Sequence, residues 1–199
     1  MGWAQQEFET IDLGDPRLNR RAVLLAERLG QKPGASIPGA CENWAETAAA
    51  YRFLRNEQVS CEEVMAAHRQ ATMGRIREHA VVLCLQDTTE LDYNGQAMTG
   101  LGPLSDEAQR GLYLHPTYVV SPEREPLGVF NAWTWARQFK AADGKRGGPC
   151  ESTRWIESYE RIAKSAQQLP QARHVCIGDR ESDMLELMVK ARDLGYPVV

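Results

Sequence analysis

Hydrophobic positions in the first 78 residues recur at the spacing of an α-helix, and polar loops interrupt them. The first long helix is predicted to begin at the N-cap Asp15, with Pro16 in its first turn, and to stop at Gly30. Its apolar face is formed by Leu18, Ala22, Leu25 and Leu29. Arginines occupy most of the remaining surface, so the helix has one side for a core and one for solvent or a ligand.

Two more helices are predicted in this region. Residues 31–39 are rich in proline and glycine and are expected to form a loop. A second helix is expected over residues 43–54 and a third over residues 61–78. Ser60 precedes the third helix and Glu63 follows three residues later, which is the pattern of a capping box.

The pattern changes after residue 78 from helical spacing to short apolar runs. Residues 80–86 are a continuous apolar run of strand length. Residues 112–121 and 127–135 indicate two strands joined by a proline-containing turn, which favours an antiparallel hairpin. A helix over Ser152–Gln168 then precedes a short buried strand at residues 174–177.

A last helix is expected over residues 184–194, closed by Gly195, and a strand from residue 197. Strands with short links, followed by strands separated by helices, predict a mixed sheet with an antiparallel and a parallel part. This is the order of a ribonuclease H-like domain, although several α/β sheets fit the same pattern. We expect an α+β to α/β protein, with a small all-helical domain over residues 1–75 and the sheet domain over residues 76–199.

Composition permits a sizeable core but argues against a strong general attraction for nucleic acid. The 199 residues are 43% hydrophobic and carry a net charge of −4, whereas nucleic-acid binders usually have a basic balance. The acidic excess is local, because residues 61–120 hold 4 Lys and Arg against 8 Asp and Glu. Bound divalent cations would offset part of that excess.

The cysteines are widely spaced, with no pair two residues apart, which argues against a zinc site or a disulfide framework. No apolar stretch is long enough to span a membrane, and no signal-peptide pattern is present. We therefore expect a soluble, cytoplasmic protein with no membrane partner.

Two aspartates follow predicted buried strands, Asp87 after the first and Asp179 after the fourth. Ligands gather at the carboxyl ends of strands in open α/β sheets. If the two strands are neighbours, we expect the carboxylates to lie roughly 4–7 Å apart, a spacing that suits a two-metal site. Paired carboxylates repel unless a cation lies between them, and hard oxygen ligands suit Mg²⁺ or Mn²⁺. From spacing alone, the equal alternative is that Asp87 is a turn residue and Asp179 a helix N-cap.

Four stretches occur in order along the chain and together carry a family resemblance. They are Leu13-Gly-Asp-Pro-Arg17, Ala50-Tyr-Arg-Phe-Leu-Arg-Asn56 with Val59-Ser60, Gln86-Asp-Thr-Thr-Glu-Leu-Asp-Tyr93 and Gly178-Asp-Arg-Glu-Ser-Asp183. They resemble the cut-and-paste DDE transposases of the insertion-sequence-four family, which includes the transposon-five transposase. The resemblance spans nearly the whole chain.

The resemblance implies a helical domain that recognises transposon ends and a ribonuclease H-like domain that cuts DNA and joins it to a target, using two Mg²⁺ (or Mn²⁺) ions. Asp87 and Asp179 match the first and second catalytic, metal-binding acids of the family. The third is a glutamate in a Tyr, Arg, Glu, Lys signature beyond the second aspartate, and the sequence contains no such segment. We therefore expect a transposase fragment whose ribonuclease H-like domain is incomplete and whose enzymatic activity depends on that glutamate.

The resemblance also implies contacts to double-stranded DNA, both transposon ends and target. The arginines expected to make them are Arg17, Arg20 and Arg21 on the first long helix, Arg52 and Arg55 on the second, and Arg180 beside Asp179. Guanidinium groups offer forked donors to phosphates and guanine edges. The alternative is a solvated face of interleaved arginine and glutamate. The complete complex would be a homodimer, DNA-associated and of bacterial type.

Two other functions stay open. One is a catalytically inactive DNA-binding remnant of a transposase. The other is a haloacid-dehalogenase-like phosphatase, because residues 177–183 resemble the last acidic motif of that family and Asp87 would then be a nucleophile. Against the phosphatase, Thr89 stands where a second aspartate is required, and an antiparallel pair between the two aspartates fits poorly.

Other polar and aromatic side chains of the sheet region are interpreted as structural. His115 lies in a predicted strand, where a packed or hydrogen-bonded histidine is commoner than a functional one. Trp133 and Trp135 alternate and share one face, so sheet packing is expected. Arg146 lies in the polar connection over residues 138–150 and is interpreted as a solvated loop residue.

Overall fold

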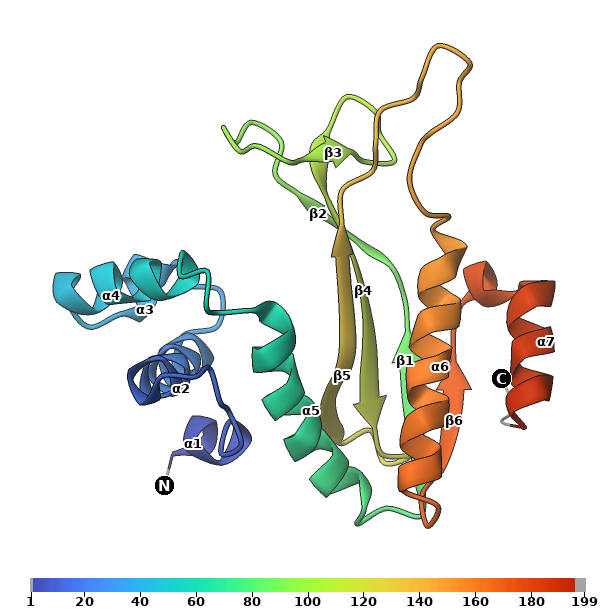
Figure 1. The fold of residues 1–199 in the computed structure, drawn as a ribbon, viewed down its shortest axis with the longest axis horizontal. Coiled ribbons are helices and arrows are strands. Elements are labelled where there is room, and N and C mark those ends of the chain that lie inside the picture. Colours follow the sequence, from blue (N-terminus) through green and yellow to red (C-terminus); the bar gives the residue numbers. More distant parts are fainter. Residues whose placement is uncertain (1, 196–199) are drawn as a thin grey trace. The chain divides into compact units, whose positions relative to one another are not determined.

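A computed structural model describes residues 2–195 and divides the chain into two compact units, one up to Gly74 and one from Arg75 onward (Figure 1). The first unit is helical, as the pattern predicts. Its helices are α1 (Trp3–Glu7), α2 (Pro16–Gln31), α3 (Ile37–Ala40), α4 (Trp44–Leu54) and α5 (Cys61–Ile76), the last of which ends in the second unit. Among residues 2–195, none of the helices is both long and apolar enough to cross a bilayer.

Side-chain caps start α2, α4 and α5, in addition to the short α3. Asp15 accepts a hydrogen bond of 2.8 Å from the backbone N–H two residues on, as an N-cap of α2. Asn43 caps α4 by accepting a hydrogen bond of 2.9 Å from the backbone N–H of Glu46, three residues on. Ser60 and Glu63 make the reciprocal bonds of a capping box at α5, at 3.1 Å and 3.3 Å. The caps at Asp15 and at Ser60 confirm the predicted helix starts.

Three details differ from the prediction. Gly30 does not end α2, which continues to Gln31. A Cβ atom at Gly30 would lie 2.3 Å from the Trp3 ring, so this glycine permits the close packing of α1 on α2. Leu29, predicted on the core face, is 36% exposed. The segment predicted as a loop over residues 31–39 already contains the start of α3, because Ser36 caps a short helical turn there.

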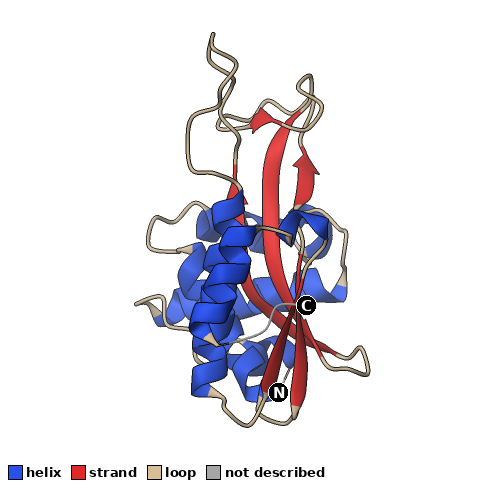
Figure 2. Ribbon diagram, turned by 90° about the vertical axis from the view of Figure 1, so that its right-hand side faces the viewer, coloured by secondary structure: helices blue, strands red, loops and turns tan. Residues whose placement is uncertain are grey.

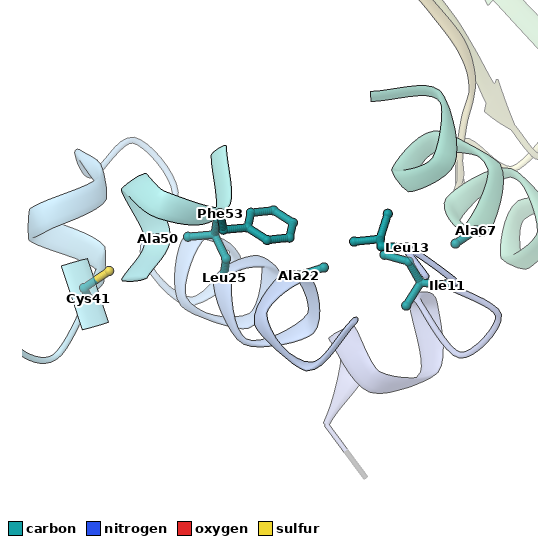
Figure 3. Packing of buried hydrophobic residues seen from close by; sticks show 8 residues of the cluster. All are labelled: Ile11, Leu13, Ala22, Leu25, Cys41, Ala50, Phe53 and Ala67. Carbon is teal, nitrogen blue, oxygen red and sulfur yellow. The ribbon is translucent and has the colours of Figure 1, made fainter. Parts of the chain in front are cut away.

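The core of the first unit joins the apolar faces of α2, α4 and α5 to the segment that precedes α2 (Figure 3). Its buried members are Ile11, Leu13, Ala22, Leu25, Cys41, Ala50, Phe53 and Ala67. Leu18 packs partly buried against this cluster, as the helical spacing predicts. Burial of each large apolar side chain contributes about 1.5–3 kcal/mol to stability.

The second unit is built on a mixed sheet. Its strands are β1 (Val81–Gln86), β2 (Thr89–Asp92), β3 (Gly102–Pro103), β4 (Arg110–Val120), β5 (Pro126–Trp135) and β6 (Arg173–Ile177). β4 pairs antiparallel with β1 and β2 along one edge and with β5 and β3 along the other. β6 pairs parallel with β1 on its far side. The resulting order β5-β4-β1-β6, with an antiparallel part and a parallel part, confirms the mixed sheet that the sequence predicts.

β2 and β3 are not apparent from the hydrophobic pattern, because β2 is mostly exposed and β3 is very short. β2 continues the line of β1 and keeps its register on β4. Gln86 pairs with Thr117, and Thr89 pairs with Leu114. Asp87 and Thr88 therefore lie between two paired segments rather than at a free strand end.

The helix α6 (Ser152–Gln168) runs alongside the sheet and has the predicted bounds (Figures 1 and 2). Its buried residues are Trp155, Ser158, Tyr159, Ile162, Ala163, Ser165 and Ala166. After β6 come a short 3-10 helix, η1 (Arg180–Ser182), and α7 (Leu185–Leu194), which packs on α6. Gly195 ends α7 in a left-handed conformation, as predicted. The strand expected from residue 197 lies outside the described residues.

Candidate metal and nucleic-acid site

Asp87 and Asp179 occupy equivalent places on adjacent parallel strands. The last paired residues of β1 and β6 are Leu85 and Ile177, and each aspartate lies two residues further on. Both aspartates therefore follow the ends of adjacent parallel strands by the same number of residues. The sheet thus aligns the carboxyl ends of β1 and β6, which are distant in sequence.

Both aspartates are exposed, and one oxygen of each holds the local backbone. Asp87 Oδ1 accepts a bond of 2.7 Å from the N–H of Thr88. Asp179 Oδ1 accepts a bond of 2.9 Å from the N–H of Glu181 and caps η1. Within residues 2–195, no protein donor reaches either Oδ2 atom, so these oxygens remain available to a ligand. Arg180 follows Asp179 directly and is exposed.

A chain of buried side chains connects the strands on either side of Asp87. The Thr88 hydroxyl and His115 Nδ1 are 2.9 Å apart, and His115 Nε2 is 3.3 Å from Gln86 Oε1. Gln86 Nε2 in turn donates to Cys176 Sγ at 2.9 Å. The hydrogen bonds therefore join β4, β1 and β6 close to the strand ends that carry the aspartates.

Burial lowers the pKa of His115 to about 4, although the negative charge of Asp87 acts in the opposite direction. The ring packs edge-on against Trp155, with 4.6 Å between centroids. A neutral imidazole has one donor and one acceptor nitrogen, which fits donation from Nε2 to Gln86 and acceptance at Nδ1 from Thr88. The prediction of a packed, hydrogen-bonded histidine is confirmed.

An acidic cleft of about 260 Å³ opens beside these strand ends. Its lining includes Thr88 and the carboxylates Glu90, Glu151 and Glu181, together with the guanidinium of Arg137. Hydrogen bonds from the Ser105 and Tyr113 side chains lower the pKa of Glu90, so this carboxylate is ionised at neutral pH. We define this cavity as the acidic cleft.

Asp87 and Asp179 are the residues at this end of the sheet that could hold a metal ion. Among residues 2–195, no group of three or more His, Cys, Asp or Glu side chains has the arrangement of a metal site. Two carboxylates nevertheless fit Mg²⁺, which commonly keeps several waters and binds through one or two protein carboxylates plus substrate phosphates. The donor chemistry therefore suits a hard divalent cation.

The predicted DNA-contacting arginines of the first unit differ in their surroundings. Arg17 is committed to the N-cap Asp15, to which Nη2 donates at 2.8 Å. Arg21 is half-buried. Arg20, Arg52 and Arg55 are exposed, and in the described part of the chain none of these three takes part in an ion pair.

One side of α4 exposes aromatic and basic residues together. Trp44 is 79% exposed and Tyr51 38% exposed, and both lie on the face that carries Arg55. Ala48 lies between them on this face and Arg52 beside it. The opposite side of α4 packs into the core, so the helix presents this aromatic and arginine stripe to solvent.

The segment that contains this stripe has a family match. Residues 1–59 match the transposase DNA-binding family. The matched segment covers α1 to α4 and the turn that precedes α5. It includes every arginine of the first unit predicted to contact DNA, namely Arg17, Arg20, Arg21, Arg52 and Arg55.

A solved structure described as a pre-cleavage Mos1 transpososome is also similar to this chain. The two share 11% sequence identity with a TM-score of 0.31, over 87% of this chain and 57% of that chain. This chain thus spans a little more than half the length of the chain it matches.

The sheet formed by β1 to β6 does not have the features expected of a haloacid-dehalogenase-like phosphatase. β1 lies between the antiparallel β4 and the parallel β6. Thr89, which stands where a second acid would be needed, begins β2 and pairs with Leu114. A nucleophilic role for Asp87 therefore lacks its partner acid.

A row of alternating arginine and aromatic side chains crosses β4, β5 and α6, and the sequence pattern did not predict it. Arg137 lies over the Tyr113 ring at 4.0 Å, and Tyr113 stacks on Trp135 at 5.5 Å. Arg154 lies over both Trp133, at 4.8 Å, and Trp135, at 5.9 Å. The shared face of the two tryptophans is confirmed, but arginines cover it. Arg161 also lies over Trp133. In the sequence, the only indication of this row is that Arg154 and Arg161 are seven residues apart and so lie on one face of α6.

Proposed function

We propose that this chain is part of a cut-and-paste DDE transposase of the insertion-sequence-four type. Its first unit binds double-stranded DNA at transposon ends, and Asp87 and Asp179 are metal ligands for cleavage and strand transfer. The observation that carries the catalytic part is the equal register of the two aspartates beyond the Leu85–Ile177 pair. Their shared position explains why two acids so far apart in sequence would act as one site.

DNA binding is supported by the transposase DNA-binding match over residues 1–59 and by the stripe on α4. Guanidinium groups bind phosphates and guanine edges, and flat aromatic rings contact sugars and bases. Arg52 and Arg55 are exposed on the same helix as Trp44, so they are the first residues expected to contact the duplex. Arg17 would have to leave Asp15 to join them.

The Oδ2 atoms of Asp87 and Asp179 are the expected ligands, because the Oδ1 atoms are held by backbone N–H groups. That anchoring fixes the orientation of each carboxylate before a cation arrives. Bound Mg²⁺ or Mn²⁺ would activate water or a 3′-hydroxyl and stabilise charge on the phosphodiester. Arg180, exposed beside Asp179, is expected to contact a phosphate of the DNA strand bound there.

The metal half of the proposal is tested by Mn²⁺ binding to the full chain, followed by electron paramagnetic resonance. Asp87→Asn and Asp179→Asn should each weaken binding by roughly tenfold or more, because each removes a charged ligand. Asp183→Asn is the matched control: Asp183 is also exposed and ends η1. Unchanged Mn²⁺ affinity in both test variants would remove the aspartates from the site.

The DNA half is tested separately, by titration of the full chain with a transposon-end duplex at several salt concentrations. Arg52→Ala with Arg55→Ala should weaken binding at every duplex sequence, because phosphate contacts are independent of sequence. Duplex binding without any Mn²⁺ binding would favour the DNA-binding remnant. A chain that bound neither the duplex nor Mn²⁺ would contradict the proposal as a whole.

A further inference from the structure

A second cavity, of about 410 Å³, adjoins the acidic cleft. It lies between the connection that follows β5 and the start of α6. Its lining is Trp135, Ala136, Arg137, Gln138, Arg146, Gly147, Gly148, Pro149, Cys150, Glu151 and Arg154. Trp135, Arg137 and Glu151 line both cavities, so the two share a wall.

The charge of this second cavity is opposite to that of the acidic cleft. Three guanidinium groups and one carboxylate line it, whereas three carboxylates and one guanidinium line the cleft. Glu151 is occupied by Arg137, which donates to both of its oxygens. Arg146 and Arg154 are the other charged groups of the lining, and each pairs with a glutamate outside it, Glu107 and Glu157; we call this cavity the basic pocket.

Arg146 and Arg154 are held in place by other residues. Arg146 donates to the carbonyl of Gln138 at 2.8 Å, and it shares Glu107 with Lys140, so two cations face one carboxylate. Arg154 donates to Glu157 at 2.7 Å while its guanidinium lies over the indole rings of Trp133 and Trp135. A guanidinium that is oriented in advance loses less freedom when it binds an anion.

The basic pocket also offers an aromatic wall and close backbone approach. Trp135 lines the pocket, and its ring lies between Tyr113, which stacks on it, and the guanidinium of Arg154. Gly148 adopts a φ of +92°, and Gly147 leaves no room for a side chain, since a Cβ atom would lie 2.4 Å from Gln138 Oε1. Positive charge beside an aromatic ring is the combination that binds nucleotides of a single strand, since every base has a π face.

We propose that the basic pocket binds an unpaired nucleotide of the DNA strand that is cut, with its phosphate on Arg146 and Arg154 and its base against Trp135. The inference rests on the proposed function, because that function supplies the strand. The two cavities would then bind groups of opposite charge. The basic pocket holds a phosphate, and the acidic end of the sheet attracts cations at the neighbouring phosphate.

Cys150 provides a direct readout of occupancy. It is exposed and lines the basic pocket, and its Sγ lies 2.9 Å from Ser152 Oγ. Hydrogen bonding from Ser152 lowers the pKa of this thiol, which favours its reaction with alkylating reagents. Cys61, exposed in the first unit, serves as an internal reference, and Cys41, Cys84 and Cys176 are buried.

The experiment measures the alkylation rates of Cys150 and Cys61 in the full chain by iodoacetamide and mass spectrometry, with and without a 5′-phosphorylated thymidine trinucleotide. EDTA is present throughout, so metal binding plays no part. The trinucleotide should slow alkylation of Cys150 several-fold and leave Cys61 unchanged. Arg146→Ala and Arg154→Ala should each raise the trinucleotide concentration needed for protection by about tenfold, the usual loss of a charged hydrogen bond.

Arg173→Ala is the matched control. Arg173 is exposed at the opposite end of β6, and its substitution removes the same charge. In this variant the trinucleotide should protect Cys150 as well as it does in the unmodified chain. Equal alkylation with and without the trinucleotide would overturn the proposal, as would protection that survives in both Arg146→Ala and Arg154→Ala. The Mn²⁺ titrations of Asp87 and Asp179 are independent of this outcome, so failure of the pocket and failure of the proposed function remain distinguishable.

Discussion

Asp87 and Asp179 lie at matching positions two residues beyond the Leu85–Ile177 pair of two adjacent parallel strands. Parallel strands run in the same direction, so β1 and β6 end at the same edge of the sheet. On one side Asp87 is held by the continuation of its strand into β2, and on the other Asp179 is held as the cap of η1. The relationship therefore depends on the register of the sheet.

If the two aspartates share a cation site, their substitutions should not be additive. Asp87→Asn and Asp179→Asn together should weaken Mn²⁺ binding by clearly less than the product of the two single effects, because the first substitution already disrupts the site. A double-mutant cycle of Mn²⁺ affinities measures this coupling. Strictly multiplicative effects would indicate two separate, weak sites.

The arginines of the first unit should differ in their effects on duplex binding. Arg52→Ala and Arg55→Ala should each lower the slope of log affinity against log salt by about 1, because each removes one phosphate contact. Arg17→Ala should have the smaller effect, since Arg17 is already paired with Asp15. The measurement is a salt series with one duplex, and an effect of Arg17 as large as those of Arg52 and Arg55 would contradict this order.

Stability should fall in mild acid because of His115. The pKa of this residue is about 4 in the folded chain, against 6.5 for an ordinary histidine, so the unfolded chain binds the proton first. The neutral His115 makes its full contribution to the free energy of unfolding above pH 6.5. As the pH falls to about 4, this free energy decreases by about 3 kcal/mol. Urea unfolding in EDTA at a series of pH values measures this loss.

His115→Gln should show a shallower decline of unfolding free energy over the same pH range. His79→Gln serves as its control, because His79 lies outside the buried hydrogen-bonded chain. An identical pH dependence in the unmodified chain and in His115→Gln would show that another group is responsible.

The first unit should depend strongly on Phe53. This side chain is 5% exposed in the core cluster, and Phe53→Ala should cost about 3–5 kcal/mol, the usual loss for a buried aromatic. Leu54→Ala changes the next residue, which is 53% exposed, and should cost far less. Thermal unfolding followed by circular dichroism compares the two. Equal losses of stability in Phe53→Ala and Leu54→Ala would contradict the burial of Phe53 in the core.

Much of the local structure follows from the sequence alone. The caps at Asp15 and at Ser60 with Glu63, both ends of α6, and the left-handed Gly195 depend only on neighbouring residues. Their physical basis is the pairing of backbone groups at helix ends and the burial of one helix face. The roles of Asp87, Asp179 and the arginines were predicted from the family resemblance and stay predictions.

Other features needed the tertiary structure, because they rest on contacts between residues far apart in the chain. β2 lacks an apolar pattern and exists only because β4 is there to pair with it. The placement of Arg146 and Arg154 around one pocket depends on how a loop meets α6, and no local rule describes it. The sequence by itself determined where the long helices and the apolar strands lie and which residues carry the acidic and basic groups. Only the fold decided which of those groups meet, because strand register and close packing are properties of the whole sheet.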